Sequence, residues 1–339
     1  MTDPVSLADQ LRRVAVGEVV EGFPLAPKTS MRVGGSARFL VRPRDRQALV
    51  ACLGVLSDAG LGWMTLGAGS DTIVGDGGID GAVLRLGPDF CADEVEEFGD
   101  SVSLTMGAGA GTARFVTLAR ELNGVGVASW AAGIPGTIGG MVALNAGTPA
   151  GSMSDHLEAV EVATPGGTFW LGADKLKLGY RSCQLPAGAV LTRARCRVRR
   201  GSDAERAAEQ RAVRIDLDKR KATQPLTLPN SGSVFVNPPG NFAGRLIEAA
   251  GMKGARRGNA QISPKHANFI VNLGEATAAD VVELIATVQK SVVNATGITL
   301  RPEVKLAGTF APPLPAELLH LNLLPVRLGR DWKPGEASA

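Results

Sequence analysis

Short apolar runs alternate with helical patterns along the first part of the chain. Three runs bounded by Gly, Pro or Asp have the length and partial alternation of β-strands, at residues 37–41, 82–86 and 102–106. Two stretches between and after them repeat apolar residues at helical spacing, at residues 45–56 and 112–122. This mixture of strands, helices and many glycines predicts an α+β domain over residues 20–200.

The pattern changes after Gly201, where a charged helical stretch covers residues 203–221 and ends at Gln224-Pro225. We therefore predict that a second, smaller α+β domain occupies residues 201–308. Its expected elements are helices at residues 243–250 and 277–294 and a strand at residues 268–272.

The chain ends in a segment that is rich in proline at both ends. We expect residues 309–339 to form a tail that packs loosely or is partly disordered.

Residues 133–147 contain five glycines and one proline but no charged side chain. Such a segment presents backbone rather than side chains, and glycine lets main-chain amides approach an anion closely or adopt a positive φ. The alternative is a tight turn that serves only packing. Glycine content alone does not separate these two interpretations.

Two other glycine-rich segments lie in the same predicted domain. Residues 67–71 leave an apolar segment, and the Ser70 hydroxyl and bare amides suit phosphate oxygens. No Gly-Lys-Ser/Thr follows, which excludes a Walker A loop, and residues 107–111 lack the expected context of a Rossmann fingerprint. The loops at 67–71 and 133–140, taken together, suggest an extended cofactor such as a dinucleotide.

The composition argues against several classes of function. The chain has 36 basic and 33 acidic residues and a net charge of +3, which argues against nucleic acid as the principal partner. The four cysteines show no paired spacing and the three histidines lie far apart, so we expect a reducing compartment and no metal site. No secretory leader or membrane-spanning run is recognised, and a cytoplasmic protein without membrane insertion is expected.

Several polar residues lie in apolar or turn surroundings where chemistry could occur. They are Arg181, Ser231, Ser233, Lys265 and the segment 301–303. Serine hydroxyls in turns usually bond to backbone, and charged residues in such places often pair with one another, so position alone favours structural roles. No GxSxG sequence is present, which argues against a serine hydrolase, whereas a hydroxyl beside a cation could donate a proton.

Taken together, the motifs resemble those of the UDP-N-acetylenolpyruvoylglucosamine reductase family over about residues 28 to 306. The matching segments follow one another in the family's order. They are residues 29–35, 67–71, 132–140, 145–147, 179–181, 232–238, 243–248, 265–272 and 301–304.

The resemblance implies an α+β fold, in which a vanillyl-alcohol-oxidase-like FAD-binding domain precedes a smaller α+β substrate-binding domain. In this family, glycine loops replace a Rossmann fingerprint. The residues implied to hold FAD are Gly67, Ala68, Gly69, Ser70, Asp71, Gly133, Ile134, Pro135, Gly136, Thr137, Gly139 and Gly140. Arg181, Ser233 and Glu303 match the catalytic positions, Asn237 and Lys265 match substrate-binding positions, and no metal is implied.

The implied activity is the NADPH-dependent reduction of UDP-N-acetyl-3-O-(1-carboxyvinyl)-glucosamine to UDP-N-acetylmuramate through FAD, in peptidoglycan precursor synthesis. Hydride would pass from flavin N5 to C3 of the enolpyruvyl group, and Ser233 would give a proton to C2. Arg181 and Glu303 would stabilise the charge that develops at the substrate carboxylate. The implied partners are the nucleotide-sugar substrate and NADPH, and a monomer is expected.

Three positions depart from the family's pattern. Asp71 stands where Asn is usual, Val236 where Lys commonly precedes Asn-Pro, and Thr148-Pro149 where Ala-Tyr is common. Tyr180 is the only tyrosine, so the chain resembles members that lack the additional tyrosine loop over the substrate.

Two alternatives stay open beside the reductase. A related FAD oxidase or dehydrogenase is disfavoured by the substrate-domain segments Gly232-Ser233 and 301–303, and because no His or Cys is suited to covalent flavin attachment. An inactive module that binds flavin or a nucleotide sugar is the other, and the changes at Asp71 and Val236 leave it some weight.

Overall fold

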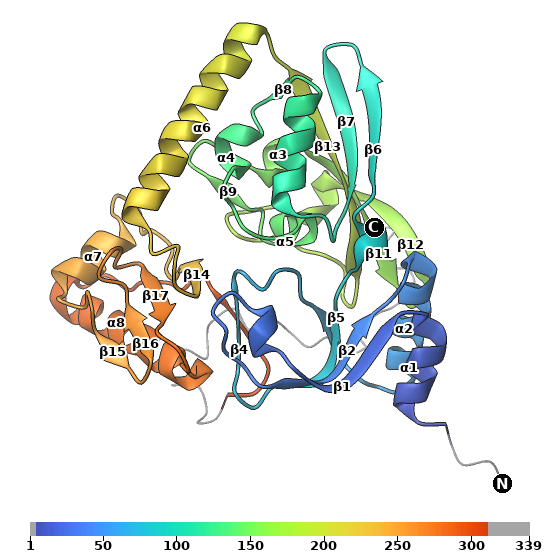
Figure 1. The fold of residues 1–339 in the computed structure, drawn as a ribbon, viewed down its shortest axis with the longest axis horizontal. Helices are drawn as coiled ribbons and strands as arrows, with labels where there is room; N and C mark the ends of the chain where they lie inside the picture. Colours follow the sequence, from blue (N-terminus) through green and yellow to red (C-terminus); the bar gives the residue numbers. More distant parts are fainter. Residues whose placement is uncertain (1–4, 311–339) are drawn as a thin grey trace.

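A computed structural model describes residues 5–310 of the chain. In its first lobe, a four-stranded sheet has the order β1-β2-β5-β3, and the helices α1 and α2 pack beside it (Figure 1). These elements are α1 (Leu7–Ala15), β1 (Glu18–Pro24), β2 (Ser36–Arg42), α2 (Arg46–Asp58), β3 (Trp63–Thr65) and β5 (Ile79–Leu84). The Asp45 carboxylate accepts the amide of Ala48 and begins α2, whose buried leucines enter the core.

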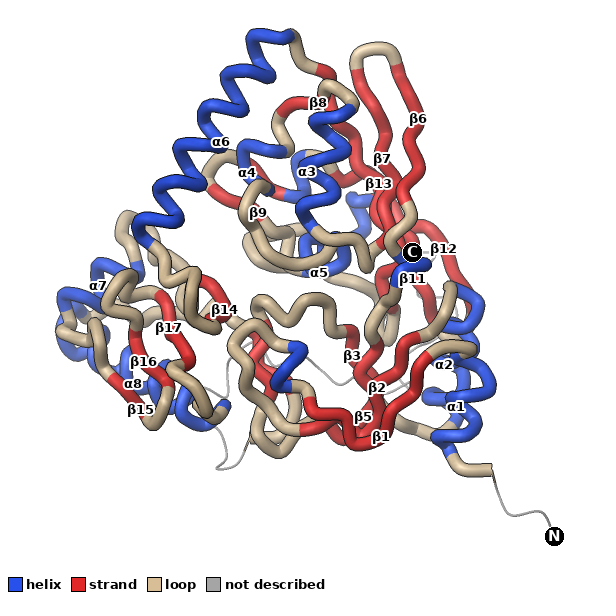
Figure 2. Tube along the Cα trace, viewed as in Figure 1, coloured by secondary structure: helices blue, strands red, loops and turns tan. Residues whose placement is uncertain are grey.

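The second lobe contains an antiparallel sheet of order β12-β11-β13-β7-β6, with β8 added to β13. Its strands are β6 (Asp93–Phe98), β7 (Ser101–Gly107), β8 (Gly124–Val125), β11 (Leu157–Thr164), β12 (Gly167–Gly172) and β13 (Val190–Arg200). Three helices lie against this lobe, α3 (Thr112–Glu121), α4 (Ala128–Ala131) and α5 (Ile138–Ala143) (Figure 2). Phe115 and Trp130 on these helices are fully buried against the strands in one apolar cluster.

A smaller unit follows, with a sheet of order β14-β17-β16-β15 and two helices (Figure 1). Its elements are β14 (Asn230–Ser233), α7 (Ala243–Ala249), β15 (Arg256–Arg257), β16 (Ala260–Ile262), β17 (Phe269–Asn272) and α8 (Ala278–Thr296). A capping box of Thr277 and Asp280 begins α8, and Gly297 ends it with a φ of 72°.

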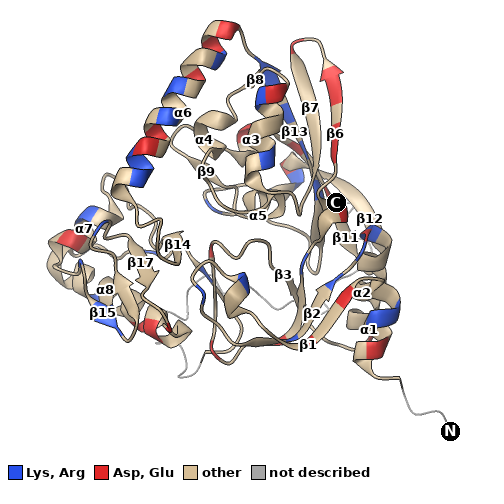
Figure 3. Ribbon diagram, in the orientation of Figure 1, with Lys and Arg blue, Asp and Glu red and all other residues tan. Residues whose placement is uncertain are grey.

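Helix α6 (Asp203–Thr223) runs from the second lobe to this smaller unit (Figure 1). None of its residues is buried, and both signs of charge follow one another along its length (Figure 3). Its contacts with the second lobe include several hydrogen bonds. Glu209 accepts the amides of Gly126 and Ser129 at 3.0 and 2.9 Å, and Arg220 donates to the carbonyl of Ala132.

The last described strand returns to the first lobe. β18 (Lys305–Ala307) pairs in parallel with β4 (Thr72–Val74), directly after the loop at residues 67–71. The segment before β18, which contains Glu303, pairs with residues 234–236 of the smaller unit.

The predicted helices are confirmed as α2, α3, α6, α7 and α8, and the predicted strands as β2, β5, β7 and β17. The strand expected at residues 82–86 begins earlier, at Ile79. The division at residue 201 stays a prediction, and the predicted tail lies almost entirely outside the described residues. Within residues 5–310, no helix is long and apolar enough to cross a membrane, and no cluster of His, Cys, Asp or Glu is arranged to hold a metal.

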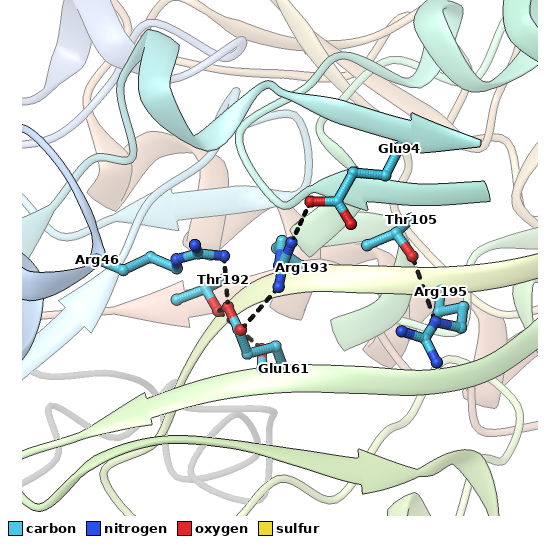
Figure 4. A network of polar contacts seen from close by, with 7 residues as sticks. All are labelled: Arg46, Glu94, Thr105, Glu161, Thr192, Arg193 and Arg195. Atoms are coloured by element: carbon cyan, nitrogen blue, oxygen red, sulfur yellow. Dashed lines mark hydrogen bonds and ion pairs between the residues drawn. The ribbon is translucent and has the colours of Figure 1, made fainter. Parts of the chain in front are cut away.

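A buried carboxylate joins the two lobes of the first domain (Figure 4). Glu161 on β11 is 7% exposed and accepts hydrogen bonds from Thr192 at 2.7 Å and Arg193 at 3.1 Å. Arg46, from α2 in the other lobe, reaches it at 3.3 Å. Burial opposes ionisation of Glu161, but Thr192 and Arg193 outweigh it and lower its pKa.

We expect Glu161→Gln to lower the free energy of unfolding by about 2 kcal/mol near neutral pH, because it leaves buried donors without their charged acceptor. Since the folded-state pKa lies below the unfolded one, this contribution is present above the unfolded pKa and is lost as the pH falls through the folded pKa. Urea unfolding of both proteins should therefore show a difference that shrinks on acidification. Glu97→Gln, at an exposed ion pair of the same sheet, should leave stability nearly unchanged.

Candidate functional site

The two glycine loops singled out in the sequence lie against each other. A Cβ added to Gly67 would lie 2.7 Å from the Thr137 hydroxyl, and the Ser70 hydroxyl donates to the carbonyl of Pro135 at 3.3 Å. A side chain at Gly67 would push the loops apart. Residues 67–71 and 133–140 therefore form one continuous surface.

This surface exposes backbone groups. Gly69, Gly133 and Gly136 have φ values of 63°, 77° and 136°, which residues other than glycine rarely adopt. Within residues 5–310, the amides of residues 68–71 donate no hydrogen bond to another protein group. Successive free amides on a tight loop form a concave site for an anion such as a pyrophosphate.

A third glycine segment, residues 107–111, completes the wall. Gly111 and Thr137 form an isolated antiparallel bridge, in which Thr112 donates to Gly136 and Ile138 donates to Ala110. The Thr112 hydroxyl is buried and has no hydrogen-bond partner among the described residues. This segment is not a Rossmann fingerprint, and its three glycines in five residues are the sequence signal that places it with the other two loops.

Asn145 connects the glycine run to a different loop. Its side-chain amide donates to the carbonyl of Gly179 at 3.0 Å, and its oxygen accepts the amide of Ser154 at 2.9 Å. The residue is buried and has a φ of 39°. Its role is to hold the segment that carries Arg181 next to the glycine run.

Arg181 and Glu303, far apart in sequence, form an ion pair. The Arg181 Nε donates to a Glu303 carboxylate oxygen, and Nη2 donates to the carbonyl of Gly147 at 2.8 Å. Both side chains are largely buried, at 25% and 15% exposed. The Arg181 backbone has a φ of 52°, and its guanidinium lies 5.2 Å from the centre of the exposed Tyr180 ring. These contacts fix a cation at the end of the glycine run.

The strand that carries Ser233 is joined by a backbone hydrogen bond of the next residue to the segment that carries Glu303. The amide of Glu303 donates to the carbonyl of Val234 at 2.7 Å, and the amide of Val234 donates to the carbonyl of Asn268. Ser233 ends β14, opposite Phe269, and is half-buried. The backbone of Ser233 thus lies near that of Glu303, whose side chain pairs with Arg181.

Asn237 and Lys265 have structural contacts of their own. The Asn237 side chain accepts the amide of Ala243 at 2.9 Å, at the start of α7. The Lys265 ammonium donates to the carbonyl of Lys221 at 2.6 Å, near the end of α6. Both side chains are exposed. Their implied contact with a substrate stays a prediction.

Asp71 is the only charged residue in the two loops at 67–71 and 133–140. Burial raises its pKa to about 7, and the neighbouring Glu303 adds to this shift, while Lys305 and Arg181 oppose it. Burial likewise lowers the pKa of Lys305 and raises that of Tyr180. The site therefore holds two carboxyl groups in unequal surroundings. Glu303 is paired with Arg181, whereas the pKa of Asp71 is raised.

Family models match both parts of the chain. The FAD binding domain model matches residues 37–171, and the model for the C-terminal domain of UDP-N-acetylenolpyruvoylglucosamine reductase matches residues 224–307. The first match covers all three glycine segments, and the second covers Ser233 and Glu303. The prediction of an α+β fold with an FAD-binding domain is confirmed.

Similar proteins carry the same description. UDP-N-acetylenolpyruvoylglucosamine reductase of Myxococcus xanthus is 46% identical over 305 residues, which span 90% of this chain and 97% of that protein. The one of Anaeromyxobacter sp. (strain Fw109-5) is 47% identical over 301 residues, or 89% and 92% of the two chains. The crystal structure of the Thermus caldophilus enzyme matches with a TM-score of 0.71 and 35% identity, over 85% of this chain and 98% of that one. These likenesses and the glycine-lined site show an FAD-containing oxidoreductase that belongs to the UDP-N-acetylenolpyruvoylglucosamine reductase family.

Proposed function

We propose that this enzyme reduces UDP-N-acetyl-3-O-(1-carboxyvinyl)-glucosamine to UDP-N-acetylmuramate, with NADPH as the reductant and FAD as the cofactor. The observation that carries the proposal is the Arg181–Glu303 pair beside Ser233, at the end of a glycine-lined surface. A fixed cation and a hydroxyl next to a flavin site are what the reduction of a carboxylate-substituted double bond requires.

The residues present fit the cofactor. Loop 67–71 offers free amides to the pyrophosphate, and its Gly67 lies so close to Thr137 of loop 133–140 that a Cβ would intrude. The Ser70 and Thr137 hydroxyls line the same surface. When bound, FAD supplies the hydride that is added to the enolpyruvyl double bond.

Arg181 acts on the charge of the substrate. Addition of hydride at C3 places negative charge on C2 and on the attached carboxylate, and a guanidinium held in advance stabilises it without reorganisation. Glu303 and the carbonyl of Gly147 hold the guanidinium in one orientation. Glu303 also keeps the site from gaining an uncompensated positive charge.

Ser233 supplies the proton that completes the reaction. Its Oγ–H bond breaks as a C–H bond forms at C2, and Arg181 nearby favours the transient alkoxide. Its place at the end of β14, one residue from the backbone bonded to Glu303, supports this role.

The activity is tested by anaerobic spectroscopy on the purified protein. NADPH should bleach the flavin bands, and UDP-N-acetylenolpyruvoylglucosamine should restore them with formation of UDP-N-acetylmuramate, identified by mass. A flavin that NADPH reduces but that this substrate does not reoxidise would refute the proposed reaction. NADPH oxidation that depends on the substrate would exclude an inactive binding module.

We expect Gly136→Val to weaken the retention of FAD by at least about tenfold. Gly136 has a φ of 136°, which valine cannot adopt without strain, and an added Cβ would lie 3.5 Å from the Ser70 hydroxyl of the other loop. Flavin occupancy after gel filtration measures the effect. Gly54→Ala, in α2 with open space around the added Cβ, is the matched control. Full occupancy in the Gly136→Val protein would mean that this loop is only a packing turn.

A further inference from the structure

The Asp71 side chain belongs to the loop that is proposed to bind an anion. It ends the loop whose free amides form the proposed pyrophosphate site, and it is half-buried. An ionised carboxylate there would oppose the binding of any anion, because the surroundings screen it less than water would. The charge of this side chain is therefore a property on which cofactor binding should depend.

The segment facing Asp71 is built by the last strand. The amide of Lys305 donates to the Asp71 carbonyl at 2.9 Å, so β18 runs directly beside the end of the loop. Among the described residues, the charged groups that act on the Asp71 carboxyl are Glu303 and Lys305 from this segment and Arg181 from the opposite lobe. Arg181 is already paired with Glu303, whereas Lys305 has no ion-pair partner among residues 5–310, and burial disfavours the charge of Lys305 as well.

We propose that Asp71 controls the affinity of the loop for the FAD pyrophosphate through its proton, so that the neutral carboxyl permits binding and the carboxylate opposes it. This inference rests on the proposed function, because it takes the loop at residues 67–71 to be a cofactor site. The direction of the effect follows from the repulsion between the Asp71 carboxylate and the negatively charged pyrophosphate. A bound anion also favours the protonated carboxyl, so binding above neutral pH must take up a proton.

The test is the dissociation constant of FAD measured by fluorescence quenching from about pH 6 to about pH 9 for three proteins. For the unaltered protein, we expect binding to weaken by up to about tenfold per pH unit above the pKa of Asp71. Asp71→Asn is neutral throughout and should show no such slope. Asp80→Asn removes an exposed carboxylate on β5, outside the site, and should keep the slope of the unaltered protein.

Calorimetry in buffers of different ionisation enthalpy gives a second readout. The unaltered protein should take up a fraction of one proton per FAD at about pH 8, and Asp71→Asn should take up none. A slope or proton uptake that persists in Asp71→Asn, or that is missing from the unaltered protein, would overturn the inference but leave the cofactor site standing. Failure of the unaltered protein to bind FAD at any pH would overturn the proposed function together with the inference.

Discussion

Ser233→Ala should reduce FAD with NADPH at nearly the rate of the unaltered protein but transfer hydride to the enolpyruvyl substrate about 10² to 10⁴ times more slowly. The substitution removes only the proton donor for C2, and flavin reduction does not use this proton. Anaerobic stopped-flow mixing separates the two half-reactions through the flavin absorbance. The selective loss in one half-reaction is the signature of a proton donor to the substrate.

Ser231→Ala is the matched control for this experiment. Ser231 lies on the same strand, two residues earlier, and its buried hydroxyl has no hydrogen-bond partner in the described part of the chain. Its removal should leave both half-reactions within a few-fold of the unaltered rates, because no bond is lost. Equal slowing of the two half-reactions in Ser233→Ala would contradict the role given to Ser233.

Glu303→Gln should slow the substrate half-reaction by about 10² to 10³-fold. Glutamine keeps the size of the side chain and an acceptor oxygen but removes the negative charge, so one of the two contacts that fix the guanidinium is weakened. Arg181 then stabilises the developing carboxylate charge less well. Because this stabilisation is realised in the transition state, kcat and kcat/KM for the substrate should fall together.

The control for Glu303→Gln is Glu248→Gln, at an exposed ion pair on α7 with Lys253. It should change neither half-reaction, because surface pairs contribute little and this one lies away from Arg181. The flavin spectrum should stay that of the unaltered protein in both variants. A Glu303→Gln protein with an unaltered substrate half-reaction would show that Glu303 has no part in holding Arg181 for catalysis.

Local chemistry made the helices and loops predictable. Helix α8 has its capping box at Thr277 and apolar residues at helical spacing, and both are visible in the sequence. The glycine loops were visible because glycine adopts positive φ values more readily than other residues and permits the close contact between the loops. In contrast, β6 is a strand with three exposed glutamates at the edge of the sheet, and no apolar pattern marks it.

The arrangement of the site could not be derived from local pattern. The contact of Gly67 with Thr137 and the pair of Arg181 with Glu303 depend on how lobes and strands far apart in sequence pack together. The resemblance to the reductase family indicates which residues belong to the site, but it does not show which of them contact one another. The partners of Asn145 and the surroundings of Asp71 appeared only in the folded chain.

The pairing of β4 with β18 also sets the order of events during synthesis. Translation proceeds from the N-terminus, so β4 leaves the ribosome long before Lys305–Ala307, its only described strand partner, has been made. The loop that precedes β4 thus lacks the strand pair that bounds it until Lys305–Ala307 has been made. A ribosome-bound fragment that ends before β18 would therefore leave β4 without this strand partner.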